Sequence, residues 1–286
     1  MHPIEHLRYV ARATGADPVS LVNETAQALR GLRTEPAGLV LAARRIVERH
    51  PTCAPLWWLC ASVLAAAEPF EKARELSDRM DADETTNHLV DALPAEATVC
   101  IVGWNPTALE ALARRGDCRA IIVDSFGTGD AAVNALERLD IEVQGVTLEH
   151  AAIGVQMSDV VIIDALGCGG TEVLSIGGSH AVAALAYCNN LPAWTVTRLG
   201  TRLPIELWNA MKLANRDAGA PWRNDVDVIP RQLLGRFIGP TGISDIDGDT
   251  ALNNVQNNVQ NNVQNNVQNF VGECPASTEM LVRSAM

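Results

Sequence analysis

The chain has 286 residues, of which 48% are hydrophobic and 20% are charged, and it is long enough for one large or two modest domains. Its formal net charge of −12 argues against a broad contact with a phosphate backbone, so we expect no direct binding to nucleic acid. The first residues lack the pattern of a signal peptide, and the longest apolar stretch, residues 56–67, is too short to cross a bilayer. These features predict a cytoplasmic protein with no membrane partner.

Residues 1–92 are expected to form a helical N-terminal domain. Apolar positions between Leu21 and Leu29 recur at helical spacing, and the stretch 56–67 is typical of a buried helix. We expect one long final helix over residues 69–93. The aromatic residues Trp57, Trp58 and Trp208 are interpreted as core or interface residues.

Residues 93–248 show a different pattern, in which short β-branched runs alternate with helical stretches. The expected strands are residues 98–102, 120–123, 141–146, 159–163 and 193–197. The expected helices are residues 108–114, 130–138, 148–156 and 178–189. Such alternation is typical of a parallel sheet with right-handed crossovers. The predicted fold class is therefore α/β, with a helical N-terminal domain followed by a doubly wound, mostly parallel Rossmann-like sheet.

Residues 249–286 form a low-complexity tail, in which the tetrapeptide Asn-Asn-Val-Gln occurs four times in succession between residues 253 and 268. A period of four drifts by about 40° per repeat against a 3.6-residue helix, so the valines would form a spiralling stripe. Asn is a poor helix former, and the repeat offers little apolar area to offset the entropy of ordering. We expect a disordered tail, with a polar helix or a strand-forming assembly segment as the alternative.

Candidate functional residues gather in residues 158–204, where the pattern predicts a strand, a glycine-rich loop, a helix and a second strand. The first strand ends at Asp164, and ligands bind at the carboxyl ends of parallel strands. Asp164 is a candidate general base or hydroxyl ligand, with helix capping or loop ordering as the structural alternative. The glycine pair Gly177–Gly178 could hold a small anion with its backbone N–H groups, and Arg198 could bind a carboxylate or phosphate. Cys168, in the loop, has no visible activator and is expected to be inert.

The remaining motifs give weaker indications of a functional site. Residues 127–132 match a dinucleotide fingerprint weakly, and we interpret them as an ordinary tight connection between a strand and a helix. The seven cysteines have neither a CxxC pair nor zinc spacing, and His2 and His6 lack a third ligand. The sequence therefore predicts no metal site and no cofactor.

Four strand-end segments resemble the motifs of a known family. Residues 98–104 look like its first strand, and residues 121–125 look like its second, which ends in Glu-Ser-Arg-Pro. Residues 160–164 resemble its Val-Gly-Ala-Asp strand, and residues 226–242 are similar to its closing segment. The family contains the α, β and δ subunits of translation initiation factor 2B, methylthioribose-1-phosphate isomerase and ribose-1,5-bisphosphate isomerase. The resemblance is close over residues 97–242 and implies that Asp164 matches the catalytic aspartate of the isomerases.

The chain departs from this family where the isomerases hold and convert a sugar phosphate. Gly103 stands at the position of the isomerase cysteine, Phe126 replaces a phosphate-binding arginine, and Leu174-Ser175 replaces an Asn-Lys pair. Loss of a guanidinium and an ammonium removes contacts that would hold a phosphate. The resemblance implies one catalytic position, Asp164, and the ligand-binding positions Gly103, Trp104, Asn105, Asp124, Ser125, Gly177, Gly178 and Arg198.

We therefore expect a non-isomerase regulatory or binding protein for a small phosphorylated or nucleotide-like ligand. A divergent aldose–ketose sugar-phosphate isomerase that uses Asp164 and a protein–protein regulatory subunit are the alternatives. An apolar cluster between Leu199 and Met211 predicts the interface of a two-fold symmetric homodimer, with Arg198 and Arg202 at its rim.

Overall fold

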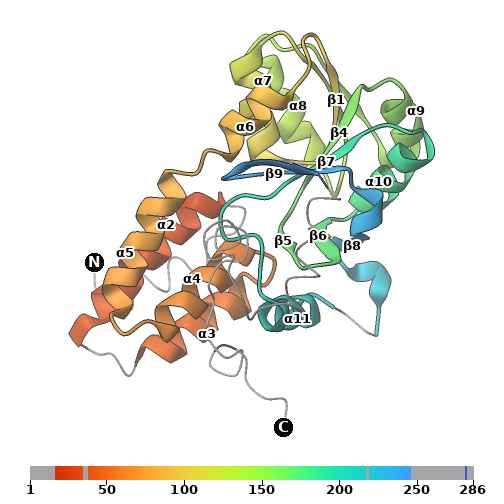
Figure 1. Cartoon of the computed structure of the whole chain (residues 1–286). Helices are drawn as coiled ribbons and strands as arrows, with labels where there is room; N and C mark the ends of the chain where they lie inside the picture. Colours follow the sequence, from red (N-terminus) through yellow and green to blue (C-terminus); the bar gives the residue numbers. More distant parts are fainter. Residues whose placement is uncertain (1–16, 35–37, 217–218, 246–280, 282–286) are drawn as a thin grey trace, which may run out of the picture.

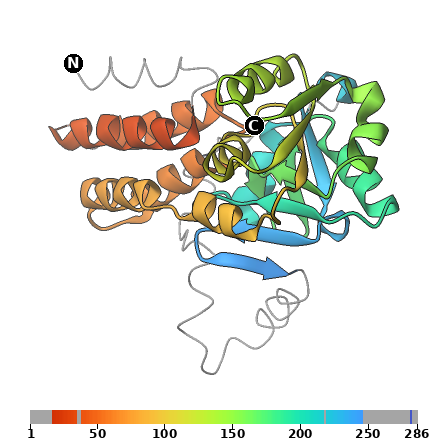
Figure 2. The same ribbon diagram turned by 90° about the horizontal axis from the view of Figure 1, so that it is seen from above.

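The computed structural model describes residues 17–34, 38–216, 219–245 and 281. The chain forms a helical part and an α/β part built around a sheet (Figure 1). Seen from above, the N-terminal helices extend to one side of the α/β part (Figure 2). No helix within these described ranges is long and apolar enough to cross a membrane. The predicted tail repeat and the His2–His6 pair lie outside the described residues.

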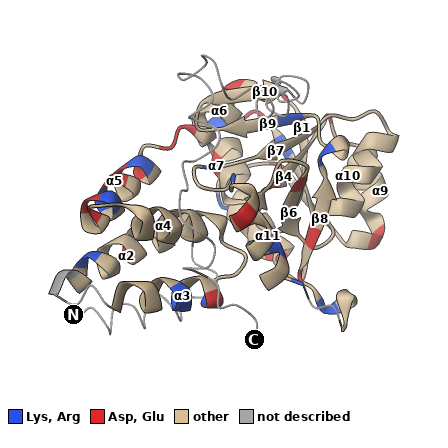
Figure 3. Cartoon of the chain, turned by 60° about the horizontal axis from the view of Figure 1, so that its bottom comes forward, with Lys and Arg blue, Asp and Glu red and all other residues tan. Residues whose placement is uncertain are grey.

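The helical part contains α2 (Pro18–Arg30), α3 (Leu39–Arg49), α4 (Ala54–Ala65) and α5 (Pro69–Asp81). Helix α2 begins where the Asp17 carboxylate accepts a hydrogen bond from the Ser20 N–H at 3.1 Å, with a proline in its first turn. Helix α4 is apolar on nearly all sides and is packed by its neighbours, so Trp57 and Trp58 are buried in this core. Helix α5 carries residues of both signs (Figure 3), and its ion pairs Lys72–Glu75 and Arg74–Asp78 lie at the surface.

The predicted single helix over residues 69–93 is wrong, because the chain forms α5 and then α6 (Thr85–Ala92). Asp83 stands at the break. Its Oδ1 accepts from the Thr85 N–H and its Oδ2 accepts from the Leu199 N–H, both at 2.8 Å. Helix α6 packs with the sheet through Leu89, and Leu93, directly after the helix, is buried in the same core. The chain thus passes from the helical part to the α/β part at Asp83.

The main sheet has seven strands in the order β10-β9-β7-β4-β1-β2-β3. Its parallel strands are β1 (Thr98–Val102), β2 (Arg119–Val123), β3 (Val143–Val146), β4 (Val160–Asp164), β7 (Ala193–Val196) and β9 (Arg236–Gly239). Strand β10 (Gly242–Asp245) is antiparallel to β9. Strand β1 lies inside the sheet, with β2 on one side and β4 on the other. The predicted α/β class with a mostly parallel sheet is confirmed.

Helices cover both faces of this sheet (Figure 1). One layer is α6 with α7 (Pro106–Arg115) and α8 (Gly129–Glu137), and the other is α9 (Ala151–Gln156) with α10 (Ser179–Cys188). Alternate residues of β1 enter the two cores: Val99 and Ile101 face the first layer, and Cys100 and Val102 face the second. The predicted helix over residues 148–156 is a 3₁₀ turn (Leu148–His150) followed by α9.

The glycine-rich loop predicted after Asp164 is instead a hairpin. Strands β5 (Gly167–Cys168) and β6 (Glu172–Ile176) are antiparallel, and β6 pairs with β8 (Val226–Pro230) in a second sheet of order β5-β6-β8. The pairing partner of β6 lies far along the chain, so local pattern could not reveal it. The main sheet with its two helix layers therefore carries a second, three-stranded sheet at its strand ends.

The apolar segment 199–211 is not an exposed interface, so that prediction is wrong. Helix α11 (Ile205–Ala214) lies against α4, and Leu203, Leu207, Trp208 and Met211 are buried in the core of the helical part. Because α4 is apolar on all sides, it needs apolar partners on this side too. Leu281, near the C-terminus, is buried in the same core.

Candidate functional site

The predicted site residues lie where four parallel strands end. Gly103, Trp104 and Asn105 follow β1, and Asp124 and Ser125 follow β2. Asp164 is the last residue of β4, Arg198 follows β7, and the glycine pair stands between β6 and α10. Because parallel strands end at the same edge, the fold brings these residues to one side of the sheet. There they form two clusters.

The first cluster surrounds the glycine pair. The Ser125 hydroxyl donates to the Gly177 carbonyl at 2.6 Å. The N–H groups of Gly178 and His180 both donate to Oδ2 of Asp227, at 2.8 and 3.0 Å. The N-terminus of α10, where an anion was predicted, therefore holds a carboxylate of the chain itself. Sequence reasoning missed Asp227, whose signal was a single acid within an apolar strand pattern.

Space beside Gly103 is filled by neighbouring side chains. Gly103 has a φ of +57°, and a Cβ there would lie 2.5 Å from Thr128 Oγ1 and 3.3 Å from Ile176 Cδ1. The position that matches the isomerase cysteine therefore has no room for a side chain unless Thr128 moves.

Aromatic rings stand at the neighbouring positions. Phe126, which replaces the family's arginine, has a φ of +52° and is 65% exposed. A Cβ on Gly177 would lie 2.7 Å from its ring, so the ring lies directly against the glycine pair. Trp104 is 45% exposed. Two exposed aromatic rings thus stand at these strand ends, where the resemblance implies charged groups.

Two predicted ligand-binding residues order the loops that carry them. Asn105 is fully buried, and its Oδ1 accepts from the Ala108 N–H at 3.0 Å, at the start of α7. The two carboxylate oxygens of Asp124 accept from the N–H groups of Gly129, at 2.7 Å, and Gly127, at 3.2 Å. These contacts support the interpretation of residues 127–132 as a tight connection from β2 to α8.

The second cluster lies between the strand ends and the helical part. Arg198 Nη1 is 3.4 Å from Oδ1 of Asp17, and Arg198 Nε is buried without a hydrogen-bond partner among the described residues. Burial raises the pKa of Asp164 to about 6, with Asp17 adding to the rise and Arg198 opposing it. The Asp164 carbonyl accepts from Ser175 Oγ at 2.7 Å. This arrangement places a carboxyl with a raised pKa within electrostatic reach of a guanidinium, which suits a hydroxyl or an anionic group.

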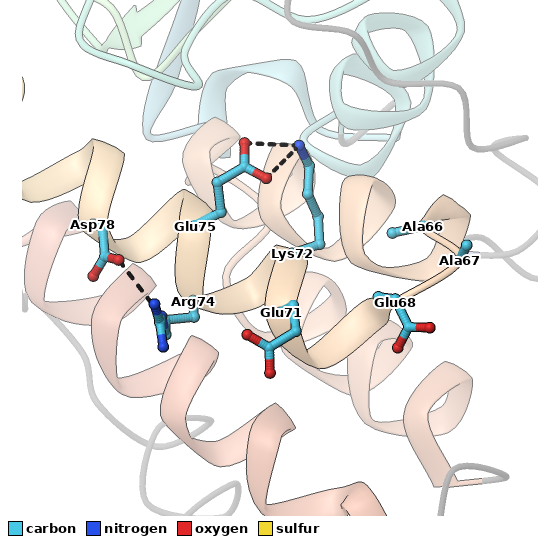
Figure 4. Close-up of a pocket in the computed structure, with 8 residues that line it drawn as sticks. All are labelled: Ala66, Ala67, Glu68, Glu71, Lys72, Arg74, Glu75 and Asp78. Atoms are coloured by element: carbon cyan, nitrogen blue, oxygen red, sulfur yellow. Dashed lines mark hydrogen bonds and ion pairs between the residues drawn. The ribbon is translucent and has the colours of Figure 1, made fainter.

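Other candidates do not add to these clusters. Cys168 is buried, and its thiol donates to the Gly169 carbonyl at 3.7 Å. Within the described part of the chain, no group of three or more His, Cys, Asp and Glu side chains gathers as a metal site. A groove of about 530 Å³ lies along α5 and the short connection that precedes it, residues 66–68 (Figure 4). Its lining residues belong to the helical part, and its charges form surface ion pairs such as Lys72–Glu75 at 2.9 Å.

Comparison with known proteins gives matches in structure alone. No protein-family model and no curated protein sequence matches the chain. Translation initiation factor eIF-2B of Pyrococcus horikoshii OT3 is 17% identical with a TM-score of 0.71, over 86% of this chain and 98% of that one. The delta subunit of the same factor from A. fulgidus is 15% identical with a TM-score of 0.60, over 90% and 91% of the two chains.

An isomerase has the same architecture. The 5-methylthioribose 1-phosphate isomerase of Pyrococcus horikoshii OT3 is 13% identical with a TM-score of 0.64, over 89% of this chain and 87% of that one. These similarities establish the fold, but they do not distinguish an initiation factor subunit from an isomerase. The chain therefore has the fold shared by translation initiation factor 2B subunits and 5-methylthioribose 1-phosphate isomerase, in agreement with the resemblance of its strand-end motifs.

Proposed function

We propose that this protein is a non-isomerase regulatory or binding protein built on the initiation factor 2B fold and acting in the cytoplasm. The observation that carries the proposal is the Asp227 carboxylate on the Gly178 and His180 N–H groups. A phosphate that bound there would have to displace this carboxylate and lose two charge-assisted hydrogen bonds, each worth about 1.5–3 kcal/mol.

The strand-end chemistry supports the same conclusion. Aldose–ketose isomerisation moves protons between two carbons of a held sugar phosphate, so it needs both a grip on the phosphate and acid–base groups. Gly103 offers no acid, and Phe126 offers no charge for a phosphate. Asp164 alone remains of the family's catalytic groups.

Turnover measurements test the proposal directly. The full chain is incubated with methylthioribose 1-phosphate and with ribose 1,5-bisphosphate, and Asp164→Asn is the matched variant. We expect no product above the buffer control with either protein. Turnover by the wild type that disappears in Asp164→Asn would contradict the proposal and favour the divergent isomerase.

A small anionic ligand at the Asp164–Arg198 cluster is a second candidate. It is favoured by the buried Arg198 Nε, which lacks a hydrogen-bond partner among the described residues, and by the long 3.4 Å contact of the same side chain with Asp17. A panel of sugar phosphates and nucleotides in a denaturation assay tests it. A ligand at 100 times its Kd adds about 2.7 kcal/mol of stability.

The assay has a matched pair of variants. Arg198→Gln should remove the shift, whereas Arg223→Gln, which alters an exposed guanidinium elsewhere, should retain it. Absence of any shift in the wild type would leave the protein–protein regulatory role, for which the tetrameric assembly named for a Chaetomium thermophilum protein of this fold is a precedent.

A further inference from the structure

The turn that carries Arg198 lies between the main sheet and the helical part, and we call residues 198–201 the arginine turn. It closes where the Thr201 N–H donates to the Arg198 carbonyl at 3.1 Å, a contact typical of a β-turn. Before the turn, the Thr197 N–H donates to a carbonyl of β9 at 2.8 Å, and at its end the Thr201 carbonyl accepts from β5 at 2.8 Å. The α/β part thus holds both ends of the turn.

The helical part holds the backbone in the middle of the arginine turn. The Leu199 N–H donates to Oδ2 of Asp83 at 2.8 Å, at the break between α5 and α6. Gly200 is buried with a φ of +78°, and a Cβ there would lie 2.8 Å from Trp58 Cε3. The turn therefore lies directly against α4, at a position where only glycine fits.

The helical part also contacts the Arg198 side chain, which is 19% exposed. Its Nη1 is 3.4 Å from Oδ1 of Asp17, while Oδ2 of the same carboxylate accepts from the Ser20 N–H at the start of α2. The position of the guanidinium therefore depends on the helical part as well as on the sheet.

The carboxyl of Asp164 responds to the position of this guanidinium. Asp164 pairs with Val196 on β7, two residues before Arg198. Burial raises the pKa of Asp164, and Arg198 opposes the rise by favouring the charged form. Because the attraction weakens with distance, a displaced arginine turn would oppose the rise less. The titration of Asp164 therefore reports where the turn holds Arg198.

We infer that Asp83 and Gly200 are positioning residues for Arg198, through which the helical part controls the Asp164–Arg198 cluster. The biological role of this control rests on the second candidate function, an anionic ligand at the cluster. A partner that displaced the helical part would weaken anion binding, and by linkage the anion would weaken the binding of that partner to the same degree. The positioning itself can be tested without a ligand.

An NMR titration of the Asp164 carboxyl carbon in the full chain, from pH 4 to pH 8, tests the inference. The signal is assigned with Asp164→Asn. Arg198→Gln gives the midpoint of the titration in the absence of the guanidinium, and it should raise this midpoint by about one pH unit.

The test variants are Asp83→Asn, which weakens the bond to the Leu199 N–H, and Gly200→Ala, which pushes the turn away from α4. The matched control is Asp81→Asn, because Asp81 is also a carboxylate at the end of α5 and accepts a 2.6 Å hydrogen bond from Asn23 within the helical part. Circular dichroism and the Tm confirm that the variants are folded.

We expect both test variants to raise the Asp164 midpoint by about half a pH unit, and the control to leave it unchanged. Loss of the negative charge of Asp83 would by itself lower the midpoint, so a rise identifies movement of the guanidinium. An unchanged midpoint in either test variant, or an equal rise in Asp81→Asn, would overturn the inference. An unchanged midpoint in Arg198→Gln would overturn it as well.

Failure of the inference and failure of the candidate function give different results. The inference fails on the Asp164 midpoints, which are measured without a ligand. The anionic ligand fails if no sugar phosphate or nucleotide of the panel stabilises the wild type.

Discussion

Replacing Asp164 by asparagine should change how stability depends on pH. The folded chain raises the pKa of this carboxyl from an ordinary value of 3.8 to about 6, mainly because it is buried. The folded state therefore binds the Asp164 proton more tightly than the unfolded state does. This contribution to stability is fully present below pH 3.8 and is lost as the pH rises through about 6.

The size of the effect follows from the shift. A difference of about two pKa units corresponds to about 3 kcal/mol between low and neutral pH. The amide introduced by the substitution does not titrate, so Asp164→Asn should gain about 2.5 kcal/mol over the wild type between pH 4 and pH 8. The gain should be complete slightly above pH 6.

Urea unfolding of both proteins at half-unit intervals from pH 4 to pH 8 measures this difference. Asp91→Asn, which changes an exposed carboxylate on α6, is the matched control and should show a flat difference. The reasoning is refuted if the Asp164→Asn difference does not vary with pH, or if it shrinks as the pH rises. A constant difference would mean that Arg198 offsets the cost of burying the charge, and a shrinking difference would mean that the folded chain lowers the pKa of Asp164 below its ordinary value.

Three further changes test the structure. Asp227→Ala removes the carboxylate from the start of α10 and should lower the free energy of unfolding in urea by about 1–2 kcal/mol. The control is Asp130→Ala, which removes an exposed acid from the first turn of α8. The loss should be absent in this control if capping, and not general charge, is responsible. Gly103→Ala should lower the Tm because its Cβ meets Thr128 Oγ1, and part of the loss should return when Thr128→Ala is added; no rescue would contradict the close approach. Leu281→Ala should cost about 2–5 kcal/mol in unfolding, and a neutral result would contradict its burial in the helical core.

Much of the α/β part was predictable because its signals are local. The strand predicted at residues 98–102 matches β1, since its β-branched and apolar residues alternate between two buried faces. The helix break at Asp83 was not predictable, because the carboxylate is held by Leu199, which is distant in sequence. The same reason hid the pairing of β6 with β8.

The sequence predicted that the candidate residues lie at strand ends, but not which of their polar groups are already held by hydrogen bonds. Strand ends followed from the fold pattern, so Asp124, Ser125 and Asp164 were placed correctly at one edge. Whether a polar group there is free or engaged depends on partners from other elements. Asp227, on the antiparallel β8, occupies the start of α10, and no local pattern links two segments that are so far apart.

The hydrogen bonds of Asp83 oppose changes in the angle between the helical and α/β parts. One oxygen of its carboxylate orders the start of α6 and the other holds the loop after β7. Any hinge motion at residues 82–84 has to release the Leu199 N–H, a charge-assisted bond worth about 1.5–3 kcal/mol. Molecules with a widened angle would therefore make up about a tenth of the population or less on account of this bond alone. A single carboxylate thus ties the start of α6 to the loop after β7.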